Sequence, residues 1–174
     1  DLQSAAACVA VAEAVQIRVD GRHTWLDGTD VTSAIRSAEA TAAASVVAQI
    51  PGVRARLVAL QRQAAAEGRY VCEGRDQGTV VFPQAEAKFF ITAAPEVRAA
   101  RRRQELAEKG EAVTLDELLA QQAERDRRDQ QRDVAPLRPA SDAVQIDTSS
   151  LTTAEVIAAM EAHVRDLGLL GANR

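Results

Sequence analysis

The chain has 174 residues, enough for one domain with a hydrophobic core. Its 47% hydrophobic and 26% charged residues argue against wholesale disorder, and its net charge of -4 argues against a strongly basic nucleic-acid binder. No apolar stretch is long enough to span a membrane, and the two cysteines lack the spacing of a zinc site or disulfide framework. These features predict a globular protein of a reducing compartment such as the cytoplasm.

The first part of the chain predicts helices and a small antiparallel sheet. Two β-prone runs, VQIRV and RHTWL, flank an Asp-Gly pair at 20–21, which is a strong hairpin signal. Ser37 suits a helix N-cap, and Pro51 suits the first position of the next helix. The predicted elements are, in order, a helix over 2–14, strands around 20–21 and near 29–32, and helices from Ser37 and from Pro51 to Gly68.

The second part alternates between strand and helix patterns. Its predicted strands are 70–72, 79–82, 88–92 and 143–147, and its predicted helices are 95–109, 114–134 and 152–168. Strands that alternate with helices are typical of a parallel sheet. The sequence therefore predicts an α/β fold.

The segment EGRDQGTVVFP, at 73–83, is the sharpest local motif. Arg75 and Asp76 stand on a turn between two glycines, directly after a predicted strand. Ligands of open α/β sheets bind beyond the carboxyl ends of strands. Arg75 can hold a phosphate, and Asp76 can accept from an amino group such as that of a nucleobase. The alternative is a surface loop with an internal Arg–Asp pair.

A second motif, ERDRRDQQRDVAPL, occupies 124–137. Its residues Arg125, Asp129 and Arg132 share one helix face by their spacing, so two guanidiniums flank a carboxylate. This arrangement fits a phosphorylated ligand with hydroxyl groups, such as a nucleotide. A solvated helix face with salt bridges explains the same charge pattern.

A third motif is the run of arginines at 101–103. Consecutive helix positions point in different directions, so the three side chains cannot all meet one ligand. One or two of them can reach a polyphosphate. A solvated helix face is again the alternative.

Taken together, GRDQGTVVFPQAEAKFFITAAPEVRAARRRQEL and ERDRRDQQRDVAPL resemble the bacterial cytidylate kinase family. The resemblance extends over essentially the whole chain. It implies a nucleoside monophosphate kinase with a three-layer α/β fold of the P-loop NTPase type and a small antiparallel β insert. It further implies that ATP, with Mg²⁺, donates its γ-phosphoryl group to CMP or dCMP, in a cytoplasmic monomer that binds neither nucleic acid nor membrane and has no metal ligands of its own.

The resemblance assigns roles to residues at matching positions. It implies that cytosine is recognised by Ser45, Arg54 and Asp76. It implies that the ribose is held by Arg125 and Asp129, and the CMP phosphate by Arg75 and Arg132. It places Arg101 and Arg102 in a lid that approaches the transferring phosphate. The whole of 1–174 is then one domain, with the monophosphate-binding insert at 8–40 and the lid with its flanking helices at 95–133.

One part of the family pattern is absent from these residues. The family has a first strand followed by a GxxGxGK[ST] phosphate loop, and then a DSGxxYR segment, but this sequence contains neither motif. We therefore expect a chain that begins after both segments and lacks the central first strand of the sheet. Unpaired strands cost stability, so we expect the isolated chain to be poorly stable and inactive as a kinase.

Two other functions compete with a kinase. The first is a non-catalytic (d)CMP-binding or pseudo-kinase domain that never had the phosphate loop. The second is an arginine-rich RNA-binding module. The net charge of -4, and the acidic residues interleaved with the arginines at 124–133, argue against the RNA-binding module.

Overall fold

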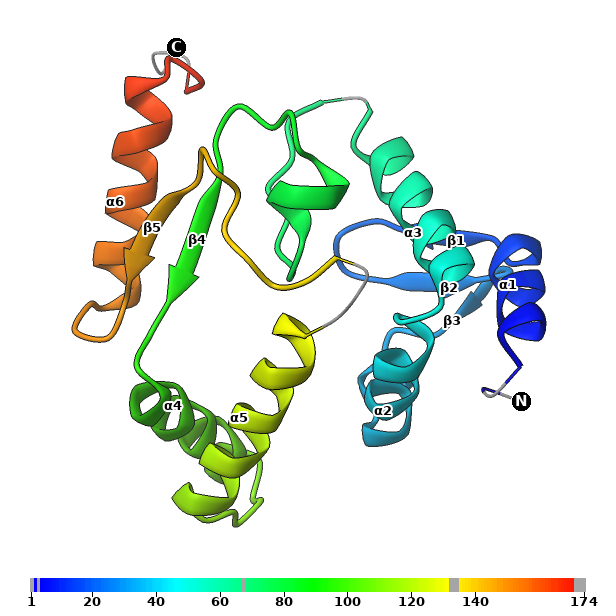
Figure 1. Cartoon of the computed structure of the whole chain (residues 1–174), viewed down its shortest axis with the longest axis horizontal. Helices are drawn as coiled ribbons and strands as arrows, with labels where there is room; N and C mark the ends of the chain where they lie inside the picture. The colour runs from blue at the N-terminus through cyan, green and yellow to red at the C-terminus, as the bar shows by residue number, and fades with distance from the viewer. Residues whose placement is uncertain (1, 3, 67, 132–134, 171–174) are drawn as a thin grey trace. The chain divides into compact units, whose positions relative to one another are not determined.

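The computed structural model describes residues 2, 4–66, 68–131 and 135–170. These residues form two compact units, Asp1–Val71 and Cys72–Arg174, which are described separately here (Figure 1). The single domain expected over 1–174 stays a prediction. No helix in the described ranges is long and apolar enough to cross a membrane.

The first unit combines helices with a small sheet. In chain order its elements are α1 (Ala5–Ala14), β1 (Ile17–Val19), β2 (Thr24–Leu26), β3 (Thr29–Asp30), the 3₁₀ turn η1 (Ala34–Arg36), α2 (Ala38–Val47) and α3 (Pro51–Ala64). Strand β2 pairs antiparallel with β1 on one side and with β3 on the other. This arrangement agrees with the antiparallel sheet predicted from the sequence.

The turn between β1 and β2 forms where the sequence predicts a hairpin. The Asp20 carboxylate accepts hydrogen bonds from the backbone N–H groups of Arg22 (3.2 Å) and His23 (3.0 Å). Gly21 adopts a left-handed φ of 86°, which costs glycine little. The local turn chemistry is thus sufficient to place this hairpin.

Helices α1 and α3 pack against each other at a glycine. An alanine Cβ at Gly52 would lie 2.6 Å from Cγ2 of Val9 on α1, so a larger residue would force the helices apart. Pro51 starts α3, as predicted. Val53 is buried beside this contact, and Arg54 follows it on the same helix.

The second unit contains the parallel strands. Its elements are the π-helical turn η2 (Gln77–Val81), β4 (Phe89–Thr92), α4 (Pro95–Glu108), α5 (Leu115–Gln130), β5 (Val144–Asp147) and α6 (Thr153–Asp166). Strands β4 and β5 pair in parallel, with Phe89 opposite Val144 and Thr92 opposite Asp147. The helices between these strands and the parallel pairing confirm the α/β class, with the antiparallel sheet in addition.

A helical hairpin carries the core of the second unit. Ala99 and Leu106 on α4 and Leu118 on α5 are buried together. Helix α5 begins with the predicted capping box, in which the Thr114 hydroxyl accepts from the Glu117 N–H and the Glu117 carboxylate accepts from the Thr114 N–H. The cap fixes the start of α5 and therefore the position of the charged residues near its end.

Two predicted strands are not strands. Residues 70–72 lie outside every ladder of the described chain, Val71 is 97% exposed, and Cys72 is exposed as well. A strand requires a neighbouring backbone to pair with, and no described segment pairs with this one.

Residues 79–82 form most of η2 instead of a strand. The N–H groups of Val80 and Val81 donate to the Asp76 carbonyl (2.9 and 3.3 Å), and the Phe82 N–H donates to the Gln77 carbonyl (2.7 Å). Val81 is fully buried in this turn. A short apolar run does not distinguish a buried strand from a buried helical turn, which explains the wrong prediction.

Candidate functional site

Arg75 and Asp76 stand immediately before η2. Asp76 is buried, while Arg75 is partly exposed. The backbone carbonyl of Asp76 accepts from the N–H groups of Thr79, Val80 and Val81 in η2, so the turn and the residue are held as one piece. Single π-helical turns occur frequently at functional sites.

Asp129 is a buried carboxylate beside two arginines. Only 3% of its side chain is exposed, and its Oδ2 lies 3.2 Å from Nε of Arg75 and 4.0 Å from Nε of Arg125. Arg125 is on the same helix, one turn earlier, as the spacing predicts. The structure therefore brings together Arg75 of the first motif with Arg125 and Asp129 of the second.

The chain after α5 folds back onto this position. The backbone N–H of Leu137 donates to the Asp129 carbonyl at 2.8 Å. Residues 136–137 belong to the APL end of the second motif. The hydrogen bond ties the end of that motif to the residue at its centre.

Glu124, on the same helix, has very different surroundings. Its carboxylate accepts hydrogen bonds from Arg127 (2.9 Å) and Arg128 (2.7 Å), and 41% of the Glu124 side chain is exposed. The hydrogen bonds from Arg127 and then Arg128 lower the pKa of Glu124 to about 2. This part of the motif is a solvated salt-bridged face, as the alternative interpretation expected.

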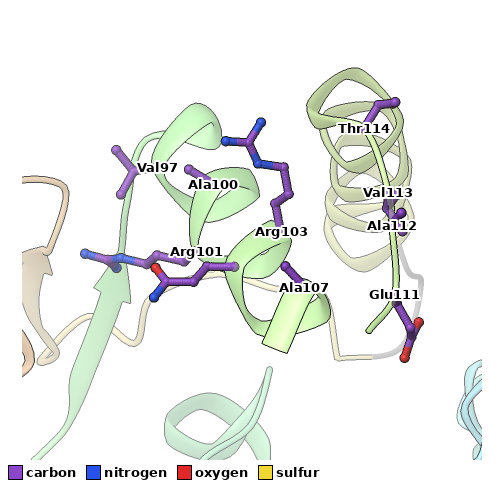
Figure 2. A pocket seen from close by; sticks show the side chains of 10 residues that line it. Val97, Ala100, Arg101, Arg103, Ala107, Glu111, Ala112, Val113 and Thr114 are labelled. Carbon is purple, nitrogen blue, oxygen red and sulfur yellow. The ribbon is translucent and has the colours of Figure 1, made fainter. Parts of the chain in front are cut away.

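The consecutive arginines of α4 have separate partners. Arg101 donates from Nη1 to the Thr148 hydroxyl (3.0 Å) and from Nη2 to the Thr148 carbonyl (2.6 Å), so it contacts the loop after β5. Arg102 pairs with Glu105 of its own helix at 3.0 Å. Figure 2 shows the side chains of Arg101 and Arg103 pointing to different sides of α4. The assignment of Arg101 and Arg102 to a lid stays a prediction.

A groove of about 870 Å³ runs beside these arginines (Figure 2). It is lined by apolar and polar residues of α4 in equal number and by residues 111–114 of the loop that leads to α5. Neither Arg75 nor Asp129 lines it. The groove and the ion-paired cluster around Asp129 are therefore separate features of the second unit.

The remaining predicted site residues are described only in part. Arg54 is half-buried on α3 of the first unit. Ser45 belongs to α2, but its side chain lies outside the described residues, and so does the whole of Arg132. The site assignment as a set stays a prediction.

Two buried polar residues, Lys88 and Thr148, were not predicted from the sequence. Lys88 is buried and pairs with Asp142 at 2.6 Å. Thr148 is buried and donates from its hydroxyl to the Thr92 carbonyl at 2.9 Å. One signal was available for Lys88, since only two of the 21 basic residues are lysines.

The cluster around Asp129 can bind both hydroxyl groups and phosphate groups of a ligand. A buried carboxylate can accept hydrogen bonds from ligand hydroxyl groups, and the guanidinium forks beside it match phosphate oxygens. A small ligand with both hydroxyl and phosphate groups satisfies both kinds of partner. A nucleoside monophosphate is a ligand of this type.

Comparison with known proteins agrees with this chemistry. A family model described as cytidylate kinase matches residues 1–166. A cytidylate kinase of Bordetella bronchiseptica is 47% identical over 154 residues, which are 88% of this chain and 69% of the relative. A cytidylate kinase of Pelotomaculum thermopropionicum is 46% identical over 159 residues, covering 90% of this chain and 70% of the relative.

A bifunctional pantoate ligase/cytidylate kinase of Synechococcus sp. is 54% identical over 132 residues, which are 76% of this chain and 24% of that relative. The chain thus spans about a quarter of this bifunctional relative and about 70% of the two cytidylate kinases above. The family match over 1–166, the identities near one half and the mixed α/β fold all agree. The chain belongs to the cytidylate kinase family, whose members are nucleoside monophosphate kinases and therefore transferases.

Proposed function

We propose that this chain binds CMP or dCMP and presents its phosphate as the acceptor of a phosphoryl group from ATP. The observation that carries the proposal is the buried Asp129 carboxylate, 3.2 Å from Arg75 and 4.0 Å from Arg125. Family membership supports it, because it implies nucleotide substrates and a nucleotide phosphate donor.

In this proposal the second unit holds the sugar and the phosphate of CMP. Asp129 accepts hydrogen bonds from the sugar hydroxyl groups, and Arg125, one turn earlier on the same helix, helps to orient the carboxylate. Arg75 and Arg132 bind the phosphate, for which a planar guanidinium provides two parallel donors. The ion pair between Arg75 and Asp129 supports this division, since it keeps the phosphate-binding and sugar-binding groups adjacent.

Ser45, Arg54 and Asp76 recognise the base. The exocyclic amine of cytosine donates to the Asp76 carboxylate and the Ser45 hydroxyl, while Arg54 donates to N3 and O2 of the ring. Uracil has a carbonyl where cytosine has its exocyclic amine, and an N–H where cytosine has the acceptor N3. An unpaired buried polar group costs about 1–3 kcal/mol, so UMP is expected to bind about tenfold more weakly than CMP or worse.

In the proposed transfer, an oxygen of the CMP phosphate attacks the γ-phosphorus of ATP. The bond from that phosphorus to the bridging oxygen breaks, ADP leaves, and CDP or dCDP forms. Arg101 and Arg102 are proposed to stabilise the charge on the moving phosphoryl group. Mg²⁺ is expected to arrive with the ATP phosphates, because it usually keeps several waters and is held by substrate phosphates with only one or two carboxylates.

The donor side needs a phosphate loop that these residues do not contain. No GxxGxGK[ST] sequence occurs in the 174 residues, and the amides and lysine of such a loop normally cradle the donor phosphates. We therefore propose that the 174 residues bind the acceptor but do not transfer phosphate without such a loop. A non-catalytic (d)CMP-binding domain is the second candidate function.

Titration calorimetry with the 174-residue chain tests the acceptor site. CMP and dCMP are expected to bind at one saturable site, and UMP at least about tenfold more weakly. Equal affinity for CMP and UMP would contradict the assignment of the base-recognition residues. Absence of CMP binding, or RNA binding with a steep salt dependence in its place, would overturn the proposal.

A coupled assay of ADP release tests the transfer half. With ATP, Mg²⁺ and CMP, the isolated chain is expected to release no more ADP than it does without CMP. CMP-dependent ADP release would show that the chain is a complete kinase. A thermal melt tests the expectation of low stability, which a cooperative transition at high temperature would contradict.

We also propose a monomer in the cytoplasm that binds neither nucleic acid nor membrane. The support is the net charge of -4 and the absence of a cysteine framework in the sequence. Sedimentation at several protein concentrations tests the oligomeric state, and a concentration-dependent dimer would contradict it.

A further inference from the structure

Lys88 is a buried cation that the proposed site does not use. Its side chain is 6% exposed, and Nζ donates to the Pro83 carbonyl and to Oδ2 of Asp142, both at 2.6 Å. Its backbone carbonyl accepts the N–H of Val144, at the start of β5, at 2.9 Å. This one residue therefore connects the loop after η2, the segment before β5 and the β4–β5 ladder.

The stem of Lys88 also packs against η2 itself. An alanine Cβ at Gly78, inside the turn, would lie 3.3 Å from Cδ of Lys88 and 3.6 Å from Cβ of Ala140. The methylene groups of Lys88 thus lie directly beneath the turn backbone. Lys88 therefore contacts η2 at two places: its stem packs against Gly78 within the turn, and its Nζ donates to the Pro83 carbonyl just after the turn ends.

We propose that Lys88 is a positioning residue for the base-recognition part of the acceptor site. Asp76 immediately precedes η2, and its carbonyl accepts three amides of that turn, so a displacement of η2 moves Asp76 with it. By fixing η2, Lys88 sets where the Asp76 carboxylate lies and thereby the preference for cytosine over uracil. The inference rests on the proposed function, in which Asp76 accepts from the amine of the base.

The chemistry of the contact favours a positioning role over a purely stabilising one. Charge-assisted hydrogen bonds are short and directional, so a lysine with two acceptors at 2.6 Å defines geometry that an apolar side chain leaves free. Asp142 is 62% exposed, and a partner of that kind adds little net stability.

The test compares two lysine variants of the full 174-residue chain. Lys88→Met keeps the length of the stem and removes both hydrogen bonds. Lys109→Met, at the only other lysine, changes an exposed residue at the end of α4 and serves as the matched control. The ratio of the UMP and CMP dissociation constants is measured for each variant.

We expect Lys88→Met to reduce this ratio about tenfold, because a misplacement of about 1 Å caused by a remote substitution can cost up to about 100-fold in function. Lys109→Met is expected to leave the ratio unchanged. Asp142→Asn keeps an oxygen that can accept a hydrogen bond from Lys88. Its ratio is therefore expected to lie between the ratio of the unmodified chain and that of Lys88→Met. A Lys88→Met chain that melts at lower temperature but keeps the full ratio would overturn the inference.

Amide hydrogen exchange provides a second readout that does not depend on nucleotide binding. The N–H groups of Val80 and Val81, which donate to Asp76, are expected to exchange faster in Lys88→Met and at the original rate in Lys109→Met. Unchanged exchange in Lys88→Met would overturn the inference even if CMP binds as proposed. Failure of the unmodified chain to discriminate CMP from UMP contradicts the proposed function instead, and the exchange data still show whether Lys88 holds the turn.

Discussion

Two carboxylates on helix α5 show how much the surroundings of a charge decide its role. Glu124 and Asp129 stand five positions apart, and each lies within an ion-pair distance of two arginines. Glu124 is 41% exposed and its arginines come from the following turn of its own helix. Asp129 is 3% exposed, and one of its arginines, Arg75, comes from the turn before β4.

We propose that this difference in burial separates a ligand-binding carboxylate, Asp129, from a solvated helix face around Glu124. A pair of exposed groups on one helix is screened by water and contributes little. A buried carboxylate that joins two distant segments is held in place and partly withdrawn from water, so a ligand finds a prepared acceptor. The predictions below test this contrast, beginning with the largest expected effect.

Asp129→Asn is expected to weaken CMP binding about 100-fold, because each hydrogen bond to a charged group contributes about 1.5–3 kcal/mol and each 1.4 kcal/mol is about tenfold. The matched change, Glu124→Gln, removes a charge from the exposed cluster of the same helix and is expected to change the affinity by less than about twofold. Calorimetric titration of both variants with CMP measures the contrast. Equal losses of affinity in the two variants would mean that burial does not distinguish these carboxylates.

A second contrast concerns stability and compares the partners of two α4 arginines, the buried Thr148 beside Arg101 and the exposed Glu105 beside Arg102. Thr148→Val removes the buried hydroxyl that donates to the Thr92 carbonyl and accepts from Arg101, so we expect a loss of about 1–3 kcal/mol in the free energy of unfolding. Arg102→Met breaks only the exposed pair with Glu105, and its loss is expected to be under about 0.5 kcal/mol. Urea unfolding of the full chain measures both. A larger loss in Arg102→Met would contradict the structural role of the Arg101–Thr148 contact.

Local chemistry explains which elements the sequence predicted correctly. The hairpin at Asp20–Gly21 and the capping boxes at Thr114 and Thr152 depend on residues within a few positions of one another, and all three form. The strands predicted at 70–72 and 79–82 did not form. Strand formation depends on a distant partner, which a local pattern does not contain.

The same division applies to the candidate site. The proximity of Arg125 to Asp129 follows from helix spacing, but their proximity to Arg75 was available only through the family resemblance. The role of Lys88 was not predicted at all. Burial of a lysine depends on how loops pack, which a local sequence pattern does not contain. The rarity of lysine among the 21 basic residues was the one usable signal that Lys88 differs from the others.

The smallest expected effect is the pH dependence contributed by Glu124. Hydrogen bonds from Arg127 and then Arg128 lower its pKa from 4.5 to about 2 in the folded chain. Because the folded-state pKa lies below the unfolded one, the stabilising contribution is fully present above pH 4.5 and is lost as the pH falls toward 2. The melting temperatures of the unmodified chain and Glu124→Gln are therefore expected to differ slightly at neutral pH and to approach each other as the pH falls from 4.5 toward 2. Added salt is expected to reduce the difference at neutral pH, because the cluster is exposed. A difference that persists unchanged in acid would show that the carboxylate charge of Glu124 is not its source.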